Sequence, residues 1–308
     1  MKELIVNKKY DGKKLNTFLL DTFPALSLNT VYKLLRKRDI RVNNIRIHEN
    51  VLLQTGDSVK VYLSDEKLSD GSSSKINCKS INPNFKLSDK EIIYEDDNIC
   101  IVNKPVGIEV TGENSLTEAL LLYYSSFISP CHRLDRNTTG LVLFAKNEES
   151  LSILLEKFKN HEIEKHYLAK VYGIPASKKA TLTAYLFKDS KKSLVYISDV
   201  PKKGYEKIIT SYEMQSSKQK ENTSILDINL HTGKTHQIRA HLAHIGYPII
   251  GDGKYGNNQI NKQFGVKVQQ LCSYSLSFQF KTDSGILDYL NHKKFELENL
   301  PISFSKVQ

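Results

Sequence analysis

The sequence contains few cysteines and no long apolar run. Its four cysteines, Cys78, Cys100, Cys131 and Cys272, are far apart and include no C-x-x-C pair, so we expect reduced thiols rather than a disulfide framework. No stretch approaches the roughly 18 apolar residues of a membrane span. The first residues also have no apolar core of the signal-peptide type. The sequence therefore predicts a cytoplasmic protein with no membrane partner.

Three further motifs are incomplete. Gly233-Lys-Thr235 matches the end of a phosphate-binding loop, but Ile228 occupies the place of its leading glycine, so we expect no nucleotide cofactor. No H-E-x-x-H arrangement and no nucleophile elbow of the type Gly-x-Ser-x-Gly is present, so neither a metal site nor a hydrolytic triad around His132 is indicated. The histidines weighed as metal ligands lie on different helical faces: His231, His236, His241 and His244.

Positive charge exceeds negative charge, and the excess is concentrated near the N-terminus. Lys and Arg number 44 against 34 Asp and Glu, which gives a net charge of +10. Residues 1–63 hold twelve Lys or Arg and six Asp or Glu. A basic surface favours a polyanionic partner through counterion release, so this segment is the candidate nucleic-acid-binding unit.

The length of 308 residues exceeds that of one typical domain of roughly 100 to 200 residues, which favours two folded units. Between them, residues 64–90 are rich in Ser, Lys, Asn and Asp, the composition of a linker. We therefore predict a first domain over 1–63, a linker over 64–90 and a second domain over 91–308.

Residues 1–63 show a helix, helix, hairpin order. Apolar spacing predicts two short helices within 13–38, separated at Pro24, and residues 40–47 predict two strands around an Asn-Asn turn, followed by a strand over 58–63. This order resembles the S4 RNA-binding domain. The resemblance makes basic residues of the second helix and the next strand candidates for RNA contact; the alternative is a solvated basic helix of a packing domain. These candidates are Lys33, Arg36, Lys37, Arg38 and Arg41.

Beyond residue 91 strands and helices mix without βαβ regularity, and no internal repeat is visible. Apolar runs predict strands over 99–102, 140–145, 166–172 and 224–230, and helical spacing predicts helices over 151–159 and 235–245. The sequence therefore predicts an α+β protein whose larger domain has a mixed, mostly antiparallel sheet.

The segment Cys131-His-Arg-Leu-Asp-Arg-Asn-Thr-Thr-Gly140 precedes one of these strands. An isolated loop aspartate such as Asp135 is more often a turn or cap residue than a catalyst. However, the segment resembles the signature around the catalytic aspartate of the RluA-type pseudouridine synthases. Segments 103–107, 165–169, 232–243 and 245–252 resemble further motifs of that family in the same order. The departures are Thr139, Lys234, Ala240 and the pair Val110-Thr111, and none removes a reactive group.

The resemblance implies an isomerase that breaks the N1 to C1′ bond of uridine and rejoins the base through C5 without a cofactor. It implies that Asp135 is the catalytic carboxylate, that Tyr167 is the active-site tyrosine, and that Arg239 pairs with the aspartate. Other residues of the matching segments are candidates for binding substrate or RNA: Arg133, Arg136, His132, Lys104, Lys234 and His236.

The expected substrate is a uridine flipped out of structured RNA, because C1′ and C5 are inaccessible in a paired stack. Relatives with an attached S4 domain commonly modify large-subunit (23S) ribosomal RNA, which makes that RNA the favoured partner of a monomeric enzyme. Two alternatives stay open: a synthase that acts on transfer RNA, and a non-catalytic S4-type RNA-binding or ribosome-associated protein.

Overall fold

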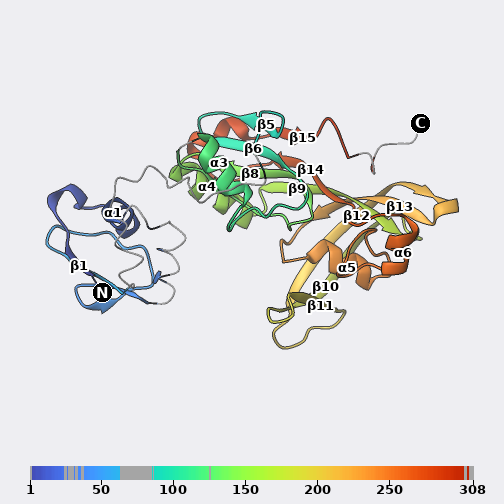
Figure 1. Cartoon of the computed structure of the whole chain (residues 1–308), viewed down its shortest axis with the longest axis horizontal. Coiled ribbons are helices and arrows are strands. Elements are labelled where there is room, and N and C mark those ends of the chain that lie inside the picture. The colour runs from blue at the N-terminus through green and yellow to red at the C-terminus, as the bar shows by residue number, and fades with distance from the viewer. Residues whose placement is uncertain are drawn as a thin grey trace. The chain divides into compact units, whose positions relative to one another are not determined.

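The computed structural model describes residues 2–23, 26, 31, 34–35, 38–62, 85, 87–124, 126–301 and 304. The chain divides into two compact units, Met1–Ser80 and Ile81–Gln308, and each has its own sheet and apolar core (Figure 1). The predicted linker 64–90 lies mostly outside the described residues, so the predicted domain limits at 63 and 91 stay predictions.

The N-terminal unit contains a four-stranded antiparallel sheet in the order β1-β4-β2-β3. The unit also contains a short 3₁₀ helix, Lys8–Tyr10. Its other elements are β1 (Lys2–Ile5), α1 (Leu15–Thr22), β2 (Ile40–Val42), β3 (Ile45–Arg46) and β4 (Ser58–Val61). The predicted strands and first helix are present, whereas β1 was not predicted. Within the predicted second helix, Val31, Leu34 and Leu35 are helical and buried, and its other residues between 27 and 37 lie outside the described part.

The C-terminal unit is built on an eleven-stranded sheet. Its strands β11-β10-β12-β13-β9-β14-β8-β6-β5 are neighbours in that order, with β15 beside β14 and β7 beside β8. Among the described pairings only β14 with β8 is parallel, so the α+β class and the mostly antiparallel sheet are as predicted. The strands are β5 (Ile92–Glu95), β6 (Ile99–Lys104), β7 (Ser129–Pro130), β8 (Thr139–Ala145), β9 (Ile163–Tyr172), β10 (Lys179–Asp189), β11 (Leu194–Ser198), β12 (Glu206–Lys218), β13 (Thr223–Leu230), β14 (Leu271–Phe278) and β15 (Lys294–Glu296).

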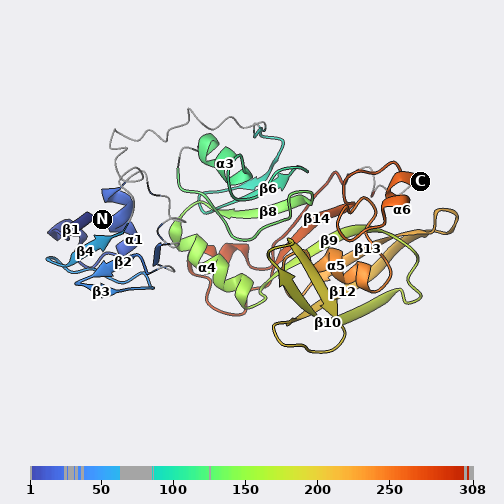
Figure 2. The same ribbon diagram turned by 60° about the horizontal axis from the view of Figure 1, so that its bottom comes forward.

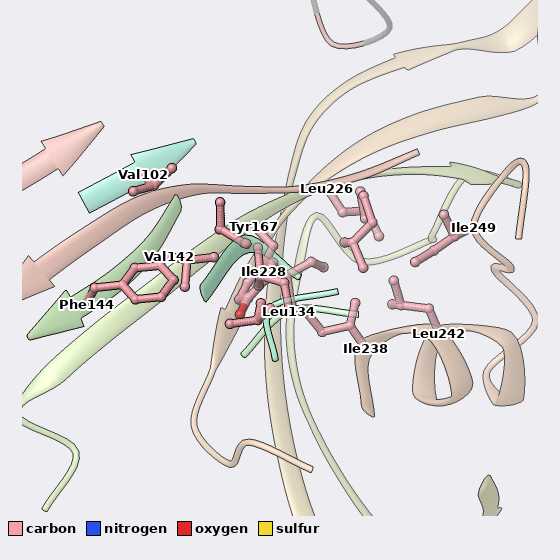
Figure 3. Packing of buried hydrophobic residues seen from close by; sticks show 14 of the residues in the cluster. Val102, Leu134, Val142, Phe144, Tyr167, Leu226, Ile228, Ile238, Leu242 and Ile249 are labelled. Carbon is pink, nitrogen blue, oxygen red and sulfur yellow. The ribbon is translucent and has the colours of Figure 1, made fainter. Parts of the chain in front are cut away.

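The middle of this sheet is covered on both faces. Along β8, Val142 and Phe144 enter one core while Leu141 and Leu143 enter the other, because side chains alternate along a strand. Burial on both faces explains why 140–145 is an uninterrupted apolar run. Figure 3 shows the first of these cores, in which Leu134, Tyr167 and Ile228 lie together.

Helices cover the two faces. Apolar residues of α3 (Leu116–Tyr124) and α5 (Gln237–His244) belong to the first core, and α4 (Glu148–Lys159) contributes to the second together with the 3₁₀ helix Gly285–Leu290 (Figure 2). A further 3₁₀ helix, Gln219–Glu221, and α6 (Asn258–Gln263) complete the unit. The helix predicted over 151–159 starts earlier because the Asn147 side chain caps it by accepting the N–H of Ser150. No helix of the described part is long and apolar enough to cross a membrane.

At two glycines, close to Asp135 and Asp252 in the sequence, another segment of the main chain approaches closely. Gly140 has a φ of 111°, and a Cβ there would lie 2.1 Å from the main-chain oxygen of Ser273 on β14. Gly251 has a φ of 82°, and a Cβ there would lie 2.1 Å from the main-chain oxygen of Val268. Both positions combine a left-handed backbone with contact at the Cα, so only glycine fits. They fix the start of β8 and the turn before Asp252.

Candidate active site

A pocket of about 240 Å³ opens where the loop between β7 and β8 meets β9 and the first residues of α5. It collects residues from three of the matching sequence segments. The residues that line it are His132, Arg133, Leu134, Asp135, Thr138, Lys165, Tyr167, Leu230, Gly233, Lys234, Thr235, His236, Gln237, Ile238, Arg239 and Leu271. The three residues predicted to be catalytic, Asp135, Tyr167 and Arg239, are therefore brought together in one cavity.

A chain of charges holds Asp135 in the pocket. Nη1 of Arg239 donates to Oδ2 of Asp135 at 2.9 Å. The other side of the same guanidinium is held by Asp252, through Nε at 2.7 Å and Nη2 at 2.9 Å. This bidentate contact fixes the plane of the guanidinium, and so the direction in which its last nitrogen points.

The charges of Asp252, Arg239 and Asp135 stabilise each other where water is largely excluded. Asp252 is fully buried and also accepts the N–H groups of Lys254 and Tyr255. Burial raises the pKa of its carboxyl, but Arg239 and these amides more than offset that effect and hold the pKa below its ordinary value. Burial likewise opposes the charge of Arg239, yet the two carboxylates keep its pKa above the ordinary value. The guanidinium is therefore a permanent cation beside Asp135.

Tyr167 lies on β9 and is 5% exposed. Its ring packs with Leu134 and Ile228 (Figure 3). Burial, reinforced by the charge of Asp135, raises the pKa of the phenol. Tyr167 therefore keeps its proton in the resting pocket and can offer a ring surface and a hydroxyl.

His236 reaches the same carboxylate from the N-cap of α5. Its Nε2 lies 3.9 Å from Oδ2 of Asp135, and its Nδ1 lies 2.8 Å from the Tyr255 hydroxyl. That hydroxyl accepts the N–H of Val195, so its own proton can go to Nδ1, which leaves the His236 proton on Nε2. Burial lowers the pKa of His236, which favours this neutral form. The residue has a φ of 53°, an uncommon backbone conformation for a residue with a side chain.

Two predicted arginines fall in different places. Arg133 lines the pocket and is exposed. Arg136 lies outside it, where Nε donates to the main-chain oxygen of Gly107 at 2.9 Å beside Glu109 and Glu113. Lys234 lines the pocket, and its ammonium is paired with Glu206 of β12.

Lys104 corrects a sequence prediction. The residue is fully buried, and its Nζ donates to the main-chain oxygens of Pro105, Ile108 and Arg136. Burial lowers its pKa to about 8. The predicted RNA contact is therefore wrong in this structure, because the ammonium binds the loop that precedes α3 to the loop that carries Asp135.

His132 is a second, partial correction. It lines the pocket, but its Nε2 accepts the N–H of Leu143 at 3.0 Å, and its Nδ1 is buried without a partner among the described residues. Burial lowers its pKa to about 3. Nε2 is occupied and Nδ1 is buried, so neither ring nitrogen is accessible to RNA in this arrangement, and the ring fastens the Asp135 loop to β8.

The candidates of the N-terminal unit are only partly described. Lys33, Arg36 and Lys37 lie outside the described residues. Arg41 stands directly opposite Arg46 on one side and Lys60 on the other, so three cations form a row across β3, β2 and β4. Arg38, just before β2, has a φ of 59°. On β1, Glu3 stands opposite Lys60 and pairs with it at 3.4 Å, so the like charges left in direct register are those of Arg41 and Arg46.

Sequence reasoning missed Lys165, which lines the pocket, and also Asp252 and Tyr255, which hold Arg239 and His236 from outside it. Asp252 ends one segment that resembles the family and Lys165 begins another, so the resemblance singled out both positions but assigned neither residue a role. Tyr255 had no such signal. In the described ranges no group of three or more His, Cys, Asp or Glu side chains is placed to hold a metal ion.

Comparisons with known proteins agree with this pocket and fold. The family described as RNA pseudouridylate synthase matches residues 98–244. Ribosomal large subunit pseudouridine synthase C of Buchnera aphidicola subsp. Baizongia pistaciae is 32% identical to the chain, with 89% of this chain and 88% of that protein aligned. An uncharacterized RNA pseudouridine synthase of Mycoplasma capricolum is also 32% identical, over 95% of this chain and 96% of that protein.

A solved structure, human RNA pseudouridylate synthase domain containing 4, has the same fold, with a TM-score of 0.57 at 21% identity over 70% of this chain and 90% of that one. The chain belongs to the RNA pseudouridine synthase family and is an isomerase. Within the family it is similar to the ribosomal large subunit synthases C.

Proposed function

We propose that this enzyme converts uridine to pseudouridine in large-subunit ribosomal RNA, with Asp135 as the catalytic carboxylate. The observation that carries the proposal is the orientation of Asp135 by Arg239, which Asp252 holds from behind. The choice of RNA rests on the names of the similar synthases, which act on the ribosomal large subunit.

Asp135 would act on the ribosyl carbon or the base while the glycosidic bond breaks. Arg239 keeps the carboxylate ionised and fixes its rotamer. Tyr167 lines the cavity with its ring, which is suited to stack on a flipped uracil, and His236 can present an N–H next to the carboxylate. All three groups act without a cofactor in this scheme.

The N-terminal unit would bind the same RNA, as an S4-like domain. The supporting observation is the row formed by Arg46, Arg41 and Lys60. Such a row contacts phosphates and adds affinity without reading sequence. The proposed division of labour gives this unit the binding of RNA and the larger unit the chemistry.

The test is release of tritium from C5-labelled uridine in large-subunit ribosomal and transfer RNA transcripts. Wild type should release tritium from the ribosomal transcript, and Asp135→Asn should lower the rate roughly a thousandfold or more. Asp199→Asn is the matched control, because that carboxylate is exposed and pairs with His244. Release only from transfer RNA would move the enzyme to that substrate, and undiminished release by Asp135→Asn would refute the catalytic assignment.

A further inference from the structure

Lys165 shares the pocket with Tyr167 and is not explained by the roles above. Both residues lie on β9, two positions apart, so their side chains leave the same face of the strand. Both line the cavity, and the Lys165 side chain is half-buried. Their Cα atoms are roughly 7 Å apart along a strand. The Lys165 ammonium therefore belongs to the same cavity as the tyrosine.

The ammonium of Lys165 has no acceptor among the described residues. Its neighbour there is the Phe158 ring, whose centroid lies 4.8 Å from Nζ. Burial lowers its pKa to about 8, and no carboxylate offsets the effect. An ammonium has three donors, and leaving them unmet in a half-buried position costs free energy.

Other lysines of the C-terminal unit have hydrogen-bond acceptors for their ammonium groups. Lys157, also over an aromatic ring, lies 2.8 Å from Glu162. Lys234, in the same pocket, is paired with Glu206, and Lys104 binds three main-chain oxygens. Lys157 and Lys104, which are fully buried, thus have acceptors for their ammonium groups. Lys165 lines the cavity with no such acceptor among the described residues.

We propose that Lys165 binds a backbone phosphate of the nucleotide that carries the target uridine. The inference rests on the proposed function, and it deepens it by dividing the pocket into an end for the base and an end for a phosphate. A phosphate carries its charge before the reaction starts, so it matches a cation that is unpaired in the resting enzyme.

The position of Lys165 favours a phosphate over the base. Arg239 and His236 approach Asp135, whereas Nζ of Lys165 lies over the Phe158 ring and 3.8 Å from the place that a Cβ on Gly233 would take. The negative charge that develops on uracil during bond cleavage forms next to the reacting carbon, at the Asp135 end. The span of roughly 7 Å from Tyr167 along β9 instead suits the distance from a stacked base to its own backbone.

The experiment combines a protein change with a substrate change. Lys165→Gln removes the charge and keeps much of the length, and the RNA carries a neutral methylphosphonate on either side of the target uridine. Lys170→Gln is the matched control, because Lys170 lies on the same strand, half-buried and 6.0 Å from the centroid of Phe264, but outside the pocket. The readout is kcat/KM for tritium release, with thermal unfolding to check each variant.

We expect Lys165→Gln to lower kcat/KM on ordinary RNA roughly tenfold to a hundredfold, mainly through KM, as for loss of a charged hydrogen bond. One of the two methylphosphonates should cost wild type a similar factor and cost Lys165→Gln almost nothing further. Lys165→Arg should recover most of the loss because it keeps the charge. Lys170→Gln should behave as wild type on every RNA.

The inference would be overturned if, for both methylphosphonates, the factor lost in kcat/KM were the same in Lys165→Gln as in wild type. An unchanged kcat/KM of Lys165→Gln on ordinary RNA would also overturn it. A loss in Lys165→Gln confined to kcat would assign the ammonium to the base instead. These failures differ from failure of the proposed function, in which wild type itself would release no tritium.

Discussion

Arg239 reaches Asp135 with one nitrogen while Asp252 occupies the other two donor positions on its far side. The direction of the contact with Asp135 is thus set by a residue that does not line the pocket. Asp252 is fully buried, and its charge is compensated by the arginine and by neighbouring amides. Any change in Asp252 should act on Asp135 through Arg239.

Asp252→Asn tests this positioning role. The asparagine amide would place N–H groups against the guanidinium and leave a buried cation undercompensated, so the unfolding free energy should fall by about 3 to 5 kcal/mol. The tritium-release rate should also fall, and mainly in kcat, because Asp135 loses its fixed partner while the RNA-binding side chains stay in place. Urea unfolding and single-turnover kinetics measure the two effects.

Asp288→Asn serves as the control, since Asp288 is exposed and accepts a hydrogen bond from the Ser284 hydroxyl. It should change stability by less than about 0.5 kcal/mol. A wild-type kcat in Asp252→Asn would show that Asp252 is not needed to orient Arg239 toward Asp135.

For individual residues, the sequence predicted which side chains line the pocket better than it predicted their contacts. Asp135, Tyr167 and Arg239 were found because each stands in a motif of fixed spacing, and the pocket brings them together. The burial of Lys104 was not predictable, because a loop lysine gives no sign of the three carbonyl oxygens that the fold arranges around it. Side-chain environment depends on long-range packing, which spacing does not encode.

The loop that carries Asp135 is an element fastened to β8 by a neutral histidine. Nε2 of His132 accepts the N–H of Leu143, and burial lowers the His132 pKa to about 3. Unfolded histidine takes up a proton below about pH 6.5 while the folded protein does not. The contribution of neutral His132 to the unfolding free energy is therefore complete above pH 6.5 and falls as the pH drops from 6.5 toward 3.

His132→Gln should reduce this acid sensitivity. The glutamine oxygen can accept the Leu143 N–H in place of Nε2, but it does not titrate. Between pH 7.5 and 5.5 wild type should lose about 1.4 kcal/mol more unfolding free energy than the variant, the equivalent of one pH unit below 6.5. Urea unfolding at the two pH values measures the difference. Identical pH dependence in both proteins would mean that His132 titrates normally in the folded state.

Among the elements, the sequence predicted those with one dominant pattern. The apolar run of β8 is buried on both faces, and α5 and α4 follow helical spacing, so all three were found near their observed limits. The strands β10, β11 and β12 were not predicted, because most of their side chains are exposed or half-buried and their apolar residues are confined to short runs. Their place is set by pairing with β13 and by α5, which packs on β11 and β12.

For the whole molecule, the row of Arg46, Arg41 and Lys60 should set the strength of RNA binding but not the rate of the chemistry. Arg46→Gln should weaken binding and reduce the dependence of log Kd on log salt by about 0.7 to 0.9, the value of one phosphate contact. Saturating single-turnover rates should stay at the wild-type value. Filter binding over a salt series measures the first effect.

Lys9→Gln is the control within the same unit, because the Lys9 ammonium already pairs with Asp21. It should leave the salt dependence almost unchanged. Equal effects of Arg46→Gln and Lys9→Gln would mean that the unit contributes only general charge.

The single parallel pairing has a consequence for how the enzyme is made. β14 lies between β8, which follows Asp135, and β9, which carries Tyr167, so these two strands meet only through a strand that ends at Phe278 (Figure 2). Synthesis proceeds from the N-terminus, and pairings so distant in sequence form late. A chain still emerging from the ribosome therefore carries Asp135, Tyr167 and Arg239 before β14 joins the strands beside the first two, and the pocket that unites these residues forms only once β14 is in place.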